Sequence, residues 1–225
     1  MCELVFRPLA HVVVLALAPL RVPPPVVVFA STACGIAGAV ELARGHLIAA
    51  ALLVQLKTVL DNADGQLARL TNRVTAFGRY LDAECDLFVN AALFAGLAWY
   101  TGRPIVSALG FIALTAVLSV NFNVERLARG AQASSDASVL GRVYALLYGW
   151  QDRLADRFLG RPPLVVVTVL AQLGMSTQLL LFGAFVALDR PAAYLGVLAL
   201  QTVLVALLLR GRQIESREEV SLEHH

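Results

Sequence analysis

Four aspartates, Asp61, Asp64, Asp82 and Asp86, stand within one short stretch between two long apolar segments. The first two are three positions apart and the last two are four positions apart, so on helices each pair projects from one face. Carboxylate oxygens are hard ligands, and four of them brought together repel one another unless cations neutralise them. The pattern therefore predicts a site for Mg²⁺, Mn²⁺ or Ca²⁺. Two such ions, about 3.5–4 Å apart, could hold a phosphoryl group for in-line displacement.

A simpler interpretation is that these aspartates are solvated residues of a polar loop. It stays open for Asp61 and Asp64. It fits Asp82 and Asp86 poorly, because both adjoin the apolar stretch that begins at Leu87, where a charge costs ~3 kcal/mol at the centre of a bilayer and less near its surface. Ionisable residues that persist in such a position usually have a function.

The composition is that of an integral membrane protein. Hydrophobic residues make up 58% of the 225 residues and charged residues 15%, against about 25% charged in a soluble domain, and the mean hydropathy is +0.72. The net charge of +2 gives no reason to expect a nucleic-acid partner. We predict an all-helical protein with six transmembrane helices, at residues 26–42, 47–60, 77–100, 105–122, 164–188 and 192–209.

The remaining segments flank this membrane domain, which we place at residues 23–212. Residues 1–22 hold a short apolar run between arginines, which is typical of an amphipathic helix lying on the membrane surface. Residues 139–159 have a similar pattern. Residues 213–225 form a charged C-terminal tail that we expect to fray, and its last four residues, LEHH, resemble the remnant of a purification tag.

Basic residues predict the orientation in the membrane. With both termini in the cytoplasm, the three short loops on the far side carry only Arg44, Arg103 and Arg190, and the other basic residues lie at the cytoplasmic surface. This topology places the aspartates at the cytoplasmic end of the helices. We expect the protein in a prokaryotic inner membrane, in contact with its lipids.

The aspartates belong to a longer motif, DxxDGxxAR, then eight residues, then GxxxDxxxD, which runs from Asp61 to Asp86. Every defined position matches the signature of the CDP-alcohol phosphotransferase family, which this chain therefore resembles. The motif covers about a ninth of the chain. The resemblance implies a homodimeric membrane enzyme of phospholipid synthesis that transfers a substituted phosphoryl group from a CDP-alcohol to a polar alcohol and releases CMP.

The resemblance also implies roles for the motif residues. The four aspartates would hold two divalent cations, Mg²⁺ or Mn²⁺, and Asp86 would also accept the proton of the attacking alcohol. The nucleotide would contact five residues: Asp64, Gly65, Ala68, Arg69 and Gly78. For three of these a structural alternative stays open. A glycine at position 65 could break or pack its helix, Gly78 could let the second and third predicted spans approach closely, and Arg69 could be an ordinary inner-surface arginine.

The acceptor alcohol is not identified by the sequence, and the donor could be lipidic, such as CDP-diacylglycerol, or soluble. If the acceptor carries phosphate, the basic residues after the fourth predicted span are candidates for binding it: Arg126, Arg129, Arg142 and Arg153. Contact with lipid headgroups is an alternative for these arginines. Two rival functions also remain, a divalent-cation transporter or channel that uses the aspartates as its ion site, and a non-catalytic scaffold.

Overall fold

The computed structural model describes residues 2–128, 167–168, 170 and 172–222, and within these ranges the chain is helical with no strand. The helices are α1 (Cys2–Leu17), α2 (Pro24–Ala43), α3 (Leu47–Leu70), α4 (Ala76–Thr101), α5 (Pro104–Ala128), α9 (Met175–Ala187) and α10 (Pro191–Leu222). The all-helical prediction is confirmed. The chain divides into two compact units, residues 1–112 with 175–196, and residues 113–174 with 197–225.

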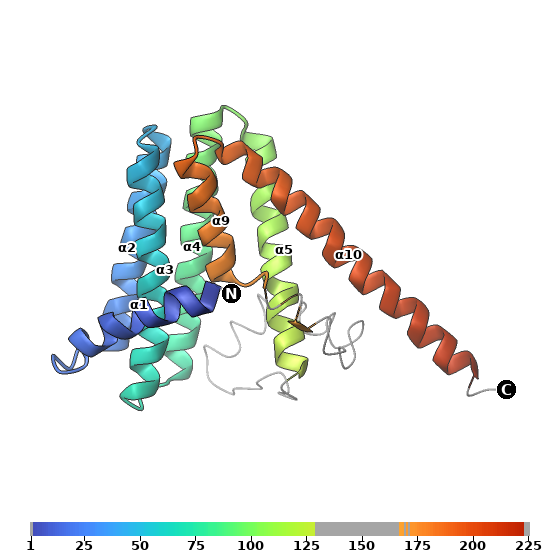
Figure 1. Cartoon of the computed structure of the whole chain (residues 1–225), viewed down its shortest axis with the longest axis horizontal. Helices are drawn as coiled ribbons and strands as arrows, with labels where there is room; N and C mark the ends of the chain where they lie inside the picture. Colours follow the sequence, from blue (N-terminus) through green and yellow to red (C-terminus); the bar gives the residue numbers. More distant parts are fainter. Residues whose placement is uncertain (1, 129–166, 169, 171, 223–225) are drawn as a thin grey trace. The chain divides into compact units, whose positions relative to one another are not determined.

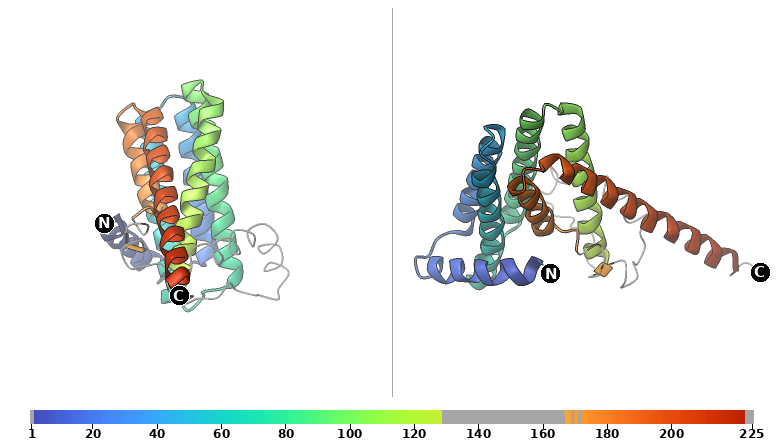
Figure 2. Two further views of the ribbon diagram at one scale, coloured as in Figure 1. Left: turned by 90° about the vertical axis from the view of Figure 1, so that its right-hand side faces the viewer. Right: turned by 45° about the horizontal axis from the view of Figure 1, so that its top comes forward.

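In the first unit, α2, α3, α4 and α9 run beside one another, and α1 lies across the ends of α2 and α3 (Figures 1 and 2). The backbone of α2 packs against both α3 and α4, and α3 also packs against α1 and α9. A short connection joins α3 to α4, and short connections favour direct packing of consecutive helices. Instead, the two helices share α2 as their main packing partner and reach each other through side chains.

Glycines explain why α2 takes this central position. A Cβ atom at Gly96 of α4 would stand 2.5 Å from the carbonyl oxygen of Ala39 on α2, and one at Gly35 of α2 would overlap Val89 of α4. On the side facing α3, a Cβ at Gly38 would lie 3.3 Å from Val54. Small residues let membrane helices approach closely. Gly35 and Gly38 therefore let α2 pack closely against α4 and α3, respectively.

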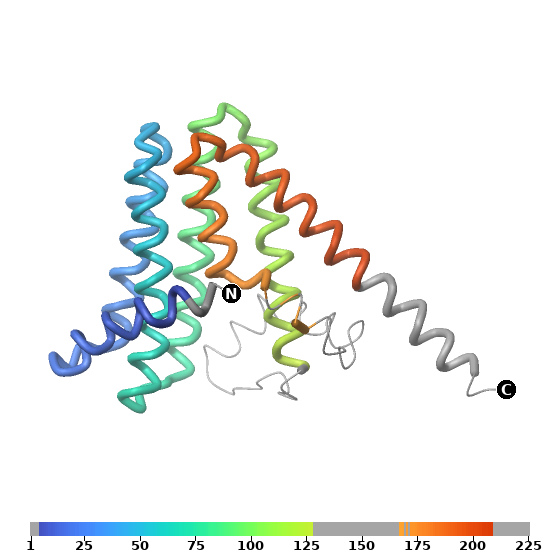
Figure 3. The backbone as a smooth tube through the Cα atoms, viewed as in Figure 1, coloured from blue at the N-terminus to red at the C-terminus, as the bar shows by residue number. Residues whose placement is uncertain are grey.

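The connection between α3 and α4 is shorter than the sequence predicts. The predicted spans leave residues 61–76 between them, but α3 continues to Leu70. The helix persists because Ala63 and Leu67 are buried against α1, in a cluster with Ala10 and Val14. The path of the tube shows the resulting tight turn (Figure 3).

The ends of both helices are capped at this turn. Asn72 adopts a left-handed conformation, with φ of 52°, and the N–H of Arg73 donates to the carbonyl oxygen of Ala68 at 2.8 Å. This arrangement satisfies carbonyl groups at the end of α3. At the start of α4, the Thr75 hydroxyl accepts a hydrogen bond from the N–H of Gly78 at 3.0 Å.

Several other predicted boundaries also shift. The predicted helix at 105–122 extends to Ala128 in α5, and α10 continues through most of the charged tail to Leu222. Fraying of that tail stays a prediction. The single helix predicted over 164–188 is wrong in its described part. A turn occupies 172–174, where the N–H of Leu173 bonds the carbonyl of Leu170 at 2.8 Å, and α9 begins after it. The predicted interfacial helix at 139–159 lies outside the described residues.

Three described helices are long and apolar enough to cross a membrane, at Pro24–Ala43, Pro104–Leu127 and Pro191–Leu208. Shorter apolar helices occur at Val5–Leu17 and Met175–Ala187. The polar ends of α3 and α4, which carry the aspartates, make these two helices less apolar overall. Six spans therefore remain a prediction.

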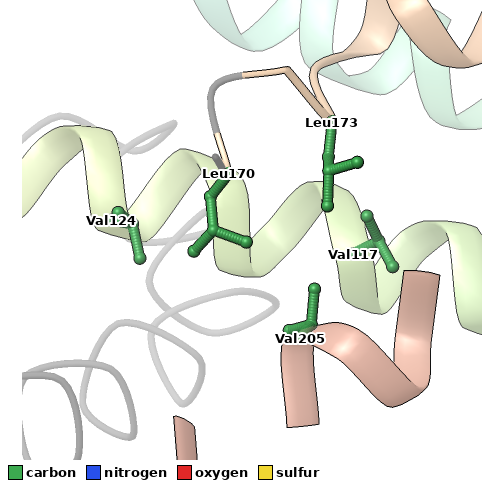
Figure 4. Packing of buried hydrophobic residues seen from close by; sticks show 5 residues of the cluster. All are labelled: Val117, Val124, Leu170, Leu173 and Val205. Atoms are coloured by element: carbon green, nitrogen blue, oxygen red, sulfur yellow. The ribbon is translucent and has the colours of Figure 1, made fainter. Parts of the chain in front are cut away.

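The second unit has its own hydrophobic core in the described residues. Figure 4 shows the side chains of Val117, Val124, Leu170, Leu173 and Val205 gathered together. Val124 is fully buried, and the exposed fraction of Leu170 is 1%. Burial of aliphatic side chains of this size stabilises a fold by about 1.5–3 kcal/mol each, so this cluster joins the later part of α5 to α10 and to residues 170–173.

We predict that Gly96→Ala destabilises the first unit by about 1–3 kcal/mol, because the added Cβ would overlap a backbone carbonyl that cannot move without shifting α2. Thermal unfolding in detergent micelles measures the effect. Gly196→Ala is the matched control, since no heavy atom lies within 4 Å of its Cβ position in the described structure. Equal melting temperatures for the two variants would show that the α2–α4 contact is looser than described.

Candidate functional site

Three of the four aspartates converge where α3 and α4 face each other. Asp61, Asp64 and Asp82 can each direct one carboxylate oxygen so that all three oxygens lie within 4.8 Å of one another. Asp61 and Asp64 come from α3 and Asp82 from α4, as the helical spacing predicts. The Ser31 hydroxyl on α2 donates to Oδ1 of Asp61 at 3.5 Å, so α2 contributes to the same site.

The convergent carboxylates fit a divalent cation. The exposed fraction of Asp64 is 6%, and its Oδ2 atom is buried without a hydrogen-bond partner among the described residues. A buried carboxylate oxygen without a donor is costly, by about 1–3 kcal/mol or more for a charged group. A hard cation bound among three such oxygens would remove that cost, and carboxylates are the ligands that Mg²⁺, Mn²⁺ and Ca²⁺ prefer.

The electrostatics of Asp64 lead to the same conclusion. This residue lies beyond the apolar part of α3, on its polar end. Burial, followed by repulsion from Asp82, Asp61 and Asp86, raises the pKa of Asp64 to about 9. A positive charge placed among these oxygens would favour the ionised form and reverse the shift.

Asp86 has a different environment, since it is not part of the group of three. Its Oδ1 atom accepts a short hydrogen bond from the ammonium group of Lys57, and the same ammonium donates to Oδ1 of Asp61 at 2.7 Å. The side chain of Lys57 is only 1% exposed, and that of Asp86 is 24% exposed. The lysine therefore links α3 to α4 and separates Asp86 from the other three carboxylates.

Sequence reasoning missed this role of Lys57, which lies before the motif that runs from Asp61 to Asp86. A signal was present, because Lys57 and Asp61 are four positions apart, the spacing at which oppositely charged residues meet on a helix. Its partnership with Asp86, twenty-nine positions away, depends on how α4 packs. Local sequence does not encode that distance.

Four of the five residues predicted to bind nucleotide, at positions 64, 65, 68 and 69, lie within two turns of α3, and Gly78 lies on α4. The guanidinium of Arg69 covers Gly65, with Nη1 3.4 Å from the position of an added Cβ. The three nearest atoms to that position, out to 3.9 Å, all belong to Arg69, and α3 continues past Gly65 to Leu70, so Gly65 does not break α3 and has no close contact with a neighbouring helix among the described residues. None of the ion pairs among the described residues involves Arg69, whose side chain is exposed. Ala68, the residue before Arg69, is half-buried.

Gly78 does not serve the packing role that the sequence suggests. A Cβ at this position would approach only the Thr75 hydroxyl, at 3.2 Å, among the described residues. Close approach of α3 and α4 at Gly78 is therefore excluded. The alternative, in which Gly78 leaves space for a ligand, stays a prediction.

The predicted acceptor-binding arginines are only partly described. Arg126 lies in the last turn of α5, where its Nη2 donates to Oδ1 of Asn123 at 3.2 Å. It belongs to the second unit, whereas the aspartates belong to the first. Arg129, Arg142 and Arg153 lie outside the described residues. The role of all four arginines stays a prediction.

The site lies within a region that matches a known protein family. A family model described as CDP-alcohol phosphatidyltransferase matches residues 16–150, which is more than half of the chain. The chain belongs to the CDP-alcohol phosphatidyltransferase family. The family resemblance drawn from the motif between Asp61 and Asp86 is thus confirmed.

Relatives within the CDP-alcohol phosphatidyltransferase family are similar over part of their length. A phosphatidylinositol phosphate synthase of Mycobacteroides abscessus is 38% identical over 78 residues, 35% of this chain and 36% of that protein. A bifunctional IPC transferase and DIPP synthase of Rubrobacter xylanophilus is 36% identical over 89 residues, 40% of this chain and 20% of that protein. The aligned segments thus span well under half of either relative.

A solved structure also resembles the chain. It is the crystal structure of Mycobacterium tuberculosis phosphatidylinositol phosphate synthase with CDP-DAG bound, with a TM-score of 0.46 and 23% sequence identity, covering 82% of this chain and 92% of that one.

We predict that Asp82→Asn weakens binding of Mn²⁺ to the purified protein by more than tenfold, about 1.4 kcal/mol, because it removes one of the three convergent charges. Competition between Mn²⁺ and a fluorescent chelator measures the affinity. Glu84→Gln is the matched control, since its neighbouring position on α4 points away from the Asp82 face. Equal losses in both variants would mean that the three carboxylates do not form the metal site.

Proposed function

We propose that this protein is a membrane transferase that moves a phosphatidyl group from CDP-diacylglycerol to the hydroxyl of a second alcohol and releases CMP in phospholipid synthesis. The observation that carries the proposal is the convergence of Asp61, Asp64 and Asp82, with a buried unpartnered oxygen on Asp64, inside the motif of the CDP-alcohol phosphatidyltransferase family. A phosphatidyl group as the transferred unit follows from the name of the family.

The residues around the metal site support binding of a nucleotide diphosphate. Arg69 is exposed, planar and covers Gly65, and a guanidinium can pair with two phosphate oxygens at once. The small residues Gly65 and Ala68 leave the helix backbone accessible beside it. We infer that the cytidine nucleotide lies on this face of α3, with its diphosphate directed toward the aspartates.

The proposed reaction needs a base for the alcohol proton and a group that stabilises the negative charge on the departing CMP. The acceptor hydroxyl would pass its proton to the carboxylate of Asp86 as its oxygen forms a bond to the donor phosphorus, and the bond from that phosphorus to the oxygen of CMP would break. When bound by Asp61, Asp64 and Asp82, a divalent cation would neutralise diphosphate oxygens and stabilise the negative charge on departing CMP. Asp64 and Arg69 would hold the donor in line for the attack.

The cofactor in this proposal is Mg²⁺ or Mn²⁺. The sequence predicts two ions, whereas the described geometry supports one position formed by three carboxylates. Whether a second ion binds depends on Asp86, which would have to exchange its contact with Lys57 for a metal.

For the acceptor, we propose a phosphorylated polyol, with inositol phosphate as the first compound to test. The support is the name of several relatives, phosphatidylinositol phosphate synthase, at 38% identity. Arg126, Arg129, Arg142 and Arg153 would bind the acceptor phosphate. The relatives are matched over less than half of their length, so this part of the proposal depends on the assay below.

We also propose a location and an assembly. The turn between α3 and α4 is flanked by exposed Arg69, Arg73 and Arg79, which favour the cytoplasmic side of a membrane. The site would then open to the cytoplasm of a prokaryotic cell, with α3, α4 and α9 as further spans and α1 on the membrane surface. The exposed apolar side chains of α1, among them Val5, Leu9 and Val12, suit that surface. A homodimer is expected from the family.

The experiment that tests the function measures CMP release by the purified protein in micelles with Mg²⁺ or Mn²⁺. CDP-diacylglycerol and CDP-inositol serve as alternative donors, each with a panel of acceptors that includes inositol phosphate, inositol, glycerol phosphate and serine. We expect CMP only with CDP-diacylglycerol and a polar alcohol. Metal flux into liposomes without CMP release under any condition would instead identify a cation transporter.

We predict that Asp86→Asn lowers the rate of CMP release by about 10²–10⁴-fold, since the amide cannot accept the alcohol proton. The affinity for Mn²⁺ should stay close to that of the wild type, because Asp86 is outside the group of three carboxylates. The melting temperature should fall but the protein should remain folded, because the buried Lys57 loses one of its two charged partners and keeps Asp61. Retention of full activity in this variant would remove Asp86 from the role of base.

We predict that Gly65→Leu raises the KM for the CDP-alcohol by about tenfold or more, by filling the space beside Arg69 that we assign to the nucleotide. Leucine favours helix by about 1 kcal/mol over glycine, so the protein should remain folded. Ala83→Leu, at an exposed position of α4, is the control and should leave KM unchanged. An unchanged KM in Gly65→Leu would place the nucleotide elsewhere.

A further inference from the structure

Two amide side chains, one from each aspartate-bearing helix, meet the first turn of α9. Nδ2 of Asn62 on α3 donates to the hydroxyl of Ser176 at 3.1 Å. Nδ2 of Asn90 on α4 donates to the sulfur of Met175 at 3.7 Å. The start of α9 therefore lies between an amide of α3 and an amide of α4.

Asn90 is poorly satisfied by the fold. Its exposed fraction is 6%, and its Oδ1 atom is buried without a hydrogen-bond partner among the described residues. The thioether of Met175, which its nitrogen contacts, is only a weak acceptor. Buried polar atoms normally have partners, because leaving one unpaired costs free energy. A buried amide in this state indicates a ligand that supplies the missing partners.

Asn90 lies on the same face of α4 as the proposed base. Residues four positions apart share one face of a helix, so Asp86, Asn90 and Phe94 form a row along α4. The ring of Phe94 packs against Phe182 of α9, with centroids 6.2 Å apart, so the row faces α9 at this end. At its other end Asp86 is only partly buried. A molecule whose hydroxyl reaches Asp86 thus has its neighbouring groups close to Asn90.

The terminus of α9 adds hydrogen-bond donors beside this amide. The first four N–H groups of a helix have no partner within it, and they carry partial positive charge. No acidic residue occurs in the first turn of α9, and the hydroxyl of Ser176 can donate as well as accept. Donors next to a buried acceptor oxygen match a group of adjacent hydroxyls, because each hydroxyl both donates and accepts.

The acceptor is the substrate that carries such hydroxyls to this place. The diacylglycerol part of the donor has ester groups and no free hydroxyl. The nucleotide, which has ribose hydroxyls, is assigned to the face around Arg69, seven positions beyond Asn62 on α3. Met175 covers the amide of Asn90, but its unbranched and flexible side chain is only half-buried, so it can make way without a movement of α9.

We propose that Asn90 binds the acceptor hydroxyl that neighbours the attacking one, so that this protein selects acceptors with two adjacent hydroxyls. The assignment rests on the proposed function. The attacking hydroxyl gives its proton to Asp86, and the adjacent hydroxyl donates to Oδ1 of Asn90. Ser176 and the N–H groups at the start of α9 bind further oxygens of the same molecule. Asn90 is thus a specificity-determining residue.

The test compares a diol acceptor with an analogue that lacks the hydroxyl beside the reacting one. Glycerol phosphate is paired with 3-hydroxypropyl phosphate, and inositol phosphate with a deoxyinositol phosphate. With CDP-diacylglycerol and Mn²⁺, the wild type should show a kcat/KM about tenfold or more higher for the diol, because the analogue leaves Oδ1 of Asn90 unpaired. Asn90→Leu should lose this preference, through a fall in kcat/KM for the diol alone.

Gln55→Met is the matched control. Gln55 on α3 is also an amide with a buried, unpartnered oxygen among the described residues, and it contacts α9 by donating to the carbonyl oxygen of Leu179 at 3.1 Å. It lies six positions before Asp61, away from the proposed hydroxyl site. This variant should keep the preference for the diol. Asn90→Leu should melt no lower than the wild type, because leucine replaces a poorly paired buried amide.

Binding without turnover is measured by the rise in melting temperature that the diol causes in the presence of Mn²⁺. The wild type and Gln55→Met should show this rise, and Asn90→Leu should not. A rise that requires Asn90, without CMP release, would refute the function and leave the hydroxyl site standing.

Three results would overturn the proposal and leave the proposed function intact. The first is an equal kcat/KM for the diol and its analogue in the wild type, which needs no variant to fold. The second is an unchanged preference in a folded Asn90→Leu. The third is CMP release only with acceptors that lack adjacent hydroxyls. No CMP release and no rise in melting temperature in the wild type would refute both proposals.

Discussion

Repulsion among four carboxylates is the interaction on which the arrangement of the N-terminal unit depends. Four aspartates on neighbouring helices would drive α3 and α4 apart unless positive charge were placed among them. The chain supplies part of that charge itself, through Lys57, which contacts one aspartate on each helix. The remaining negative charge, on the converging carboxylates of Asp61, Asp64 and Asp82, is not neutralised by the protein. This excess negative charge enables the site to bind a cation.

The packing of α2 makes it possible to hold these charges at the required distance. Because Gly35 and Gly96 let α2 and α4 approach closely, and Gly38 does the same for α2 and α3, the positions of α3 and α4 are set by a shared neighbour. The two helices that carry the aspartates are therefore positioned without extensive backbone contact with each other. α1 and α9 complete the support of α3, through the buried cluster around Leu67 and through hydrogen bonds such as that from Asn62 to the Ser176 hydroxyl, at 3.1 Å.

Much of this site could be predicted from sequence because its information is local. Helical spacing places Asp61 with Asp64, and a motif of fixed intervals identifies the family. The extent of α3 beyond Gly65 could not be predicted, since it depends on burial of Ala63 and Leu67 against α1, a segment some fifty residues away. The same holds for Lys57, whose contact with Asp86 exists only once α2 has fixed the spacing of its neighbours. The composition indicates membrane helices, but it does not settle whether α3 and α4, with their charged ends, cross the bilayer.

The two cationic residues of this site differ in a way that separates their roles. Lys57 is buried and paired twice, so its charge is present whether or not a ligand is bound. Arg69 is exposed and forms none of the ion pairs among the described residues, so its charge is available to an arriving anion. A site that binds a diphosphate needs a buried cation and an exposed cation. The buried cation holds the carboxylates together before the ligand enters, and the exposed cation donates hydrogen bonds to the ligand once it is bound. An ion channel would have no use for the second cation beside its acidic residues, since it would repel the permeating ion. Arg69 above Gly65 thus favours an anionic ligand at this metal site, and with it a transferase.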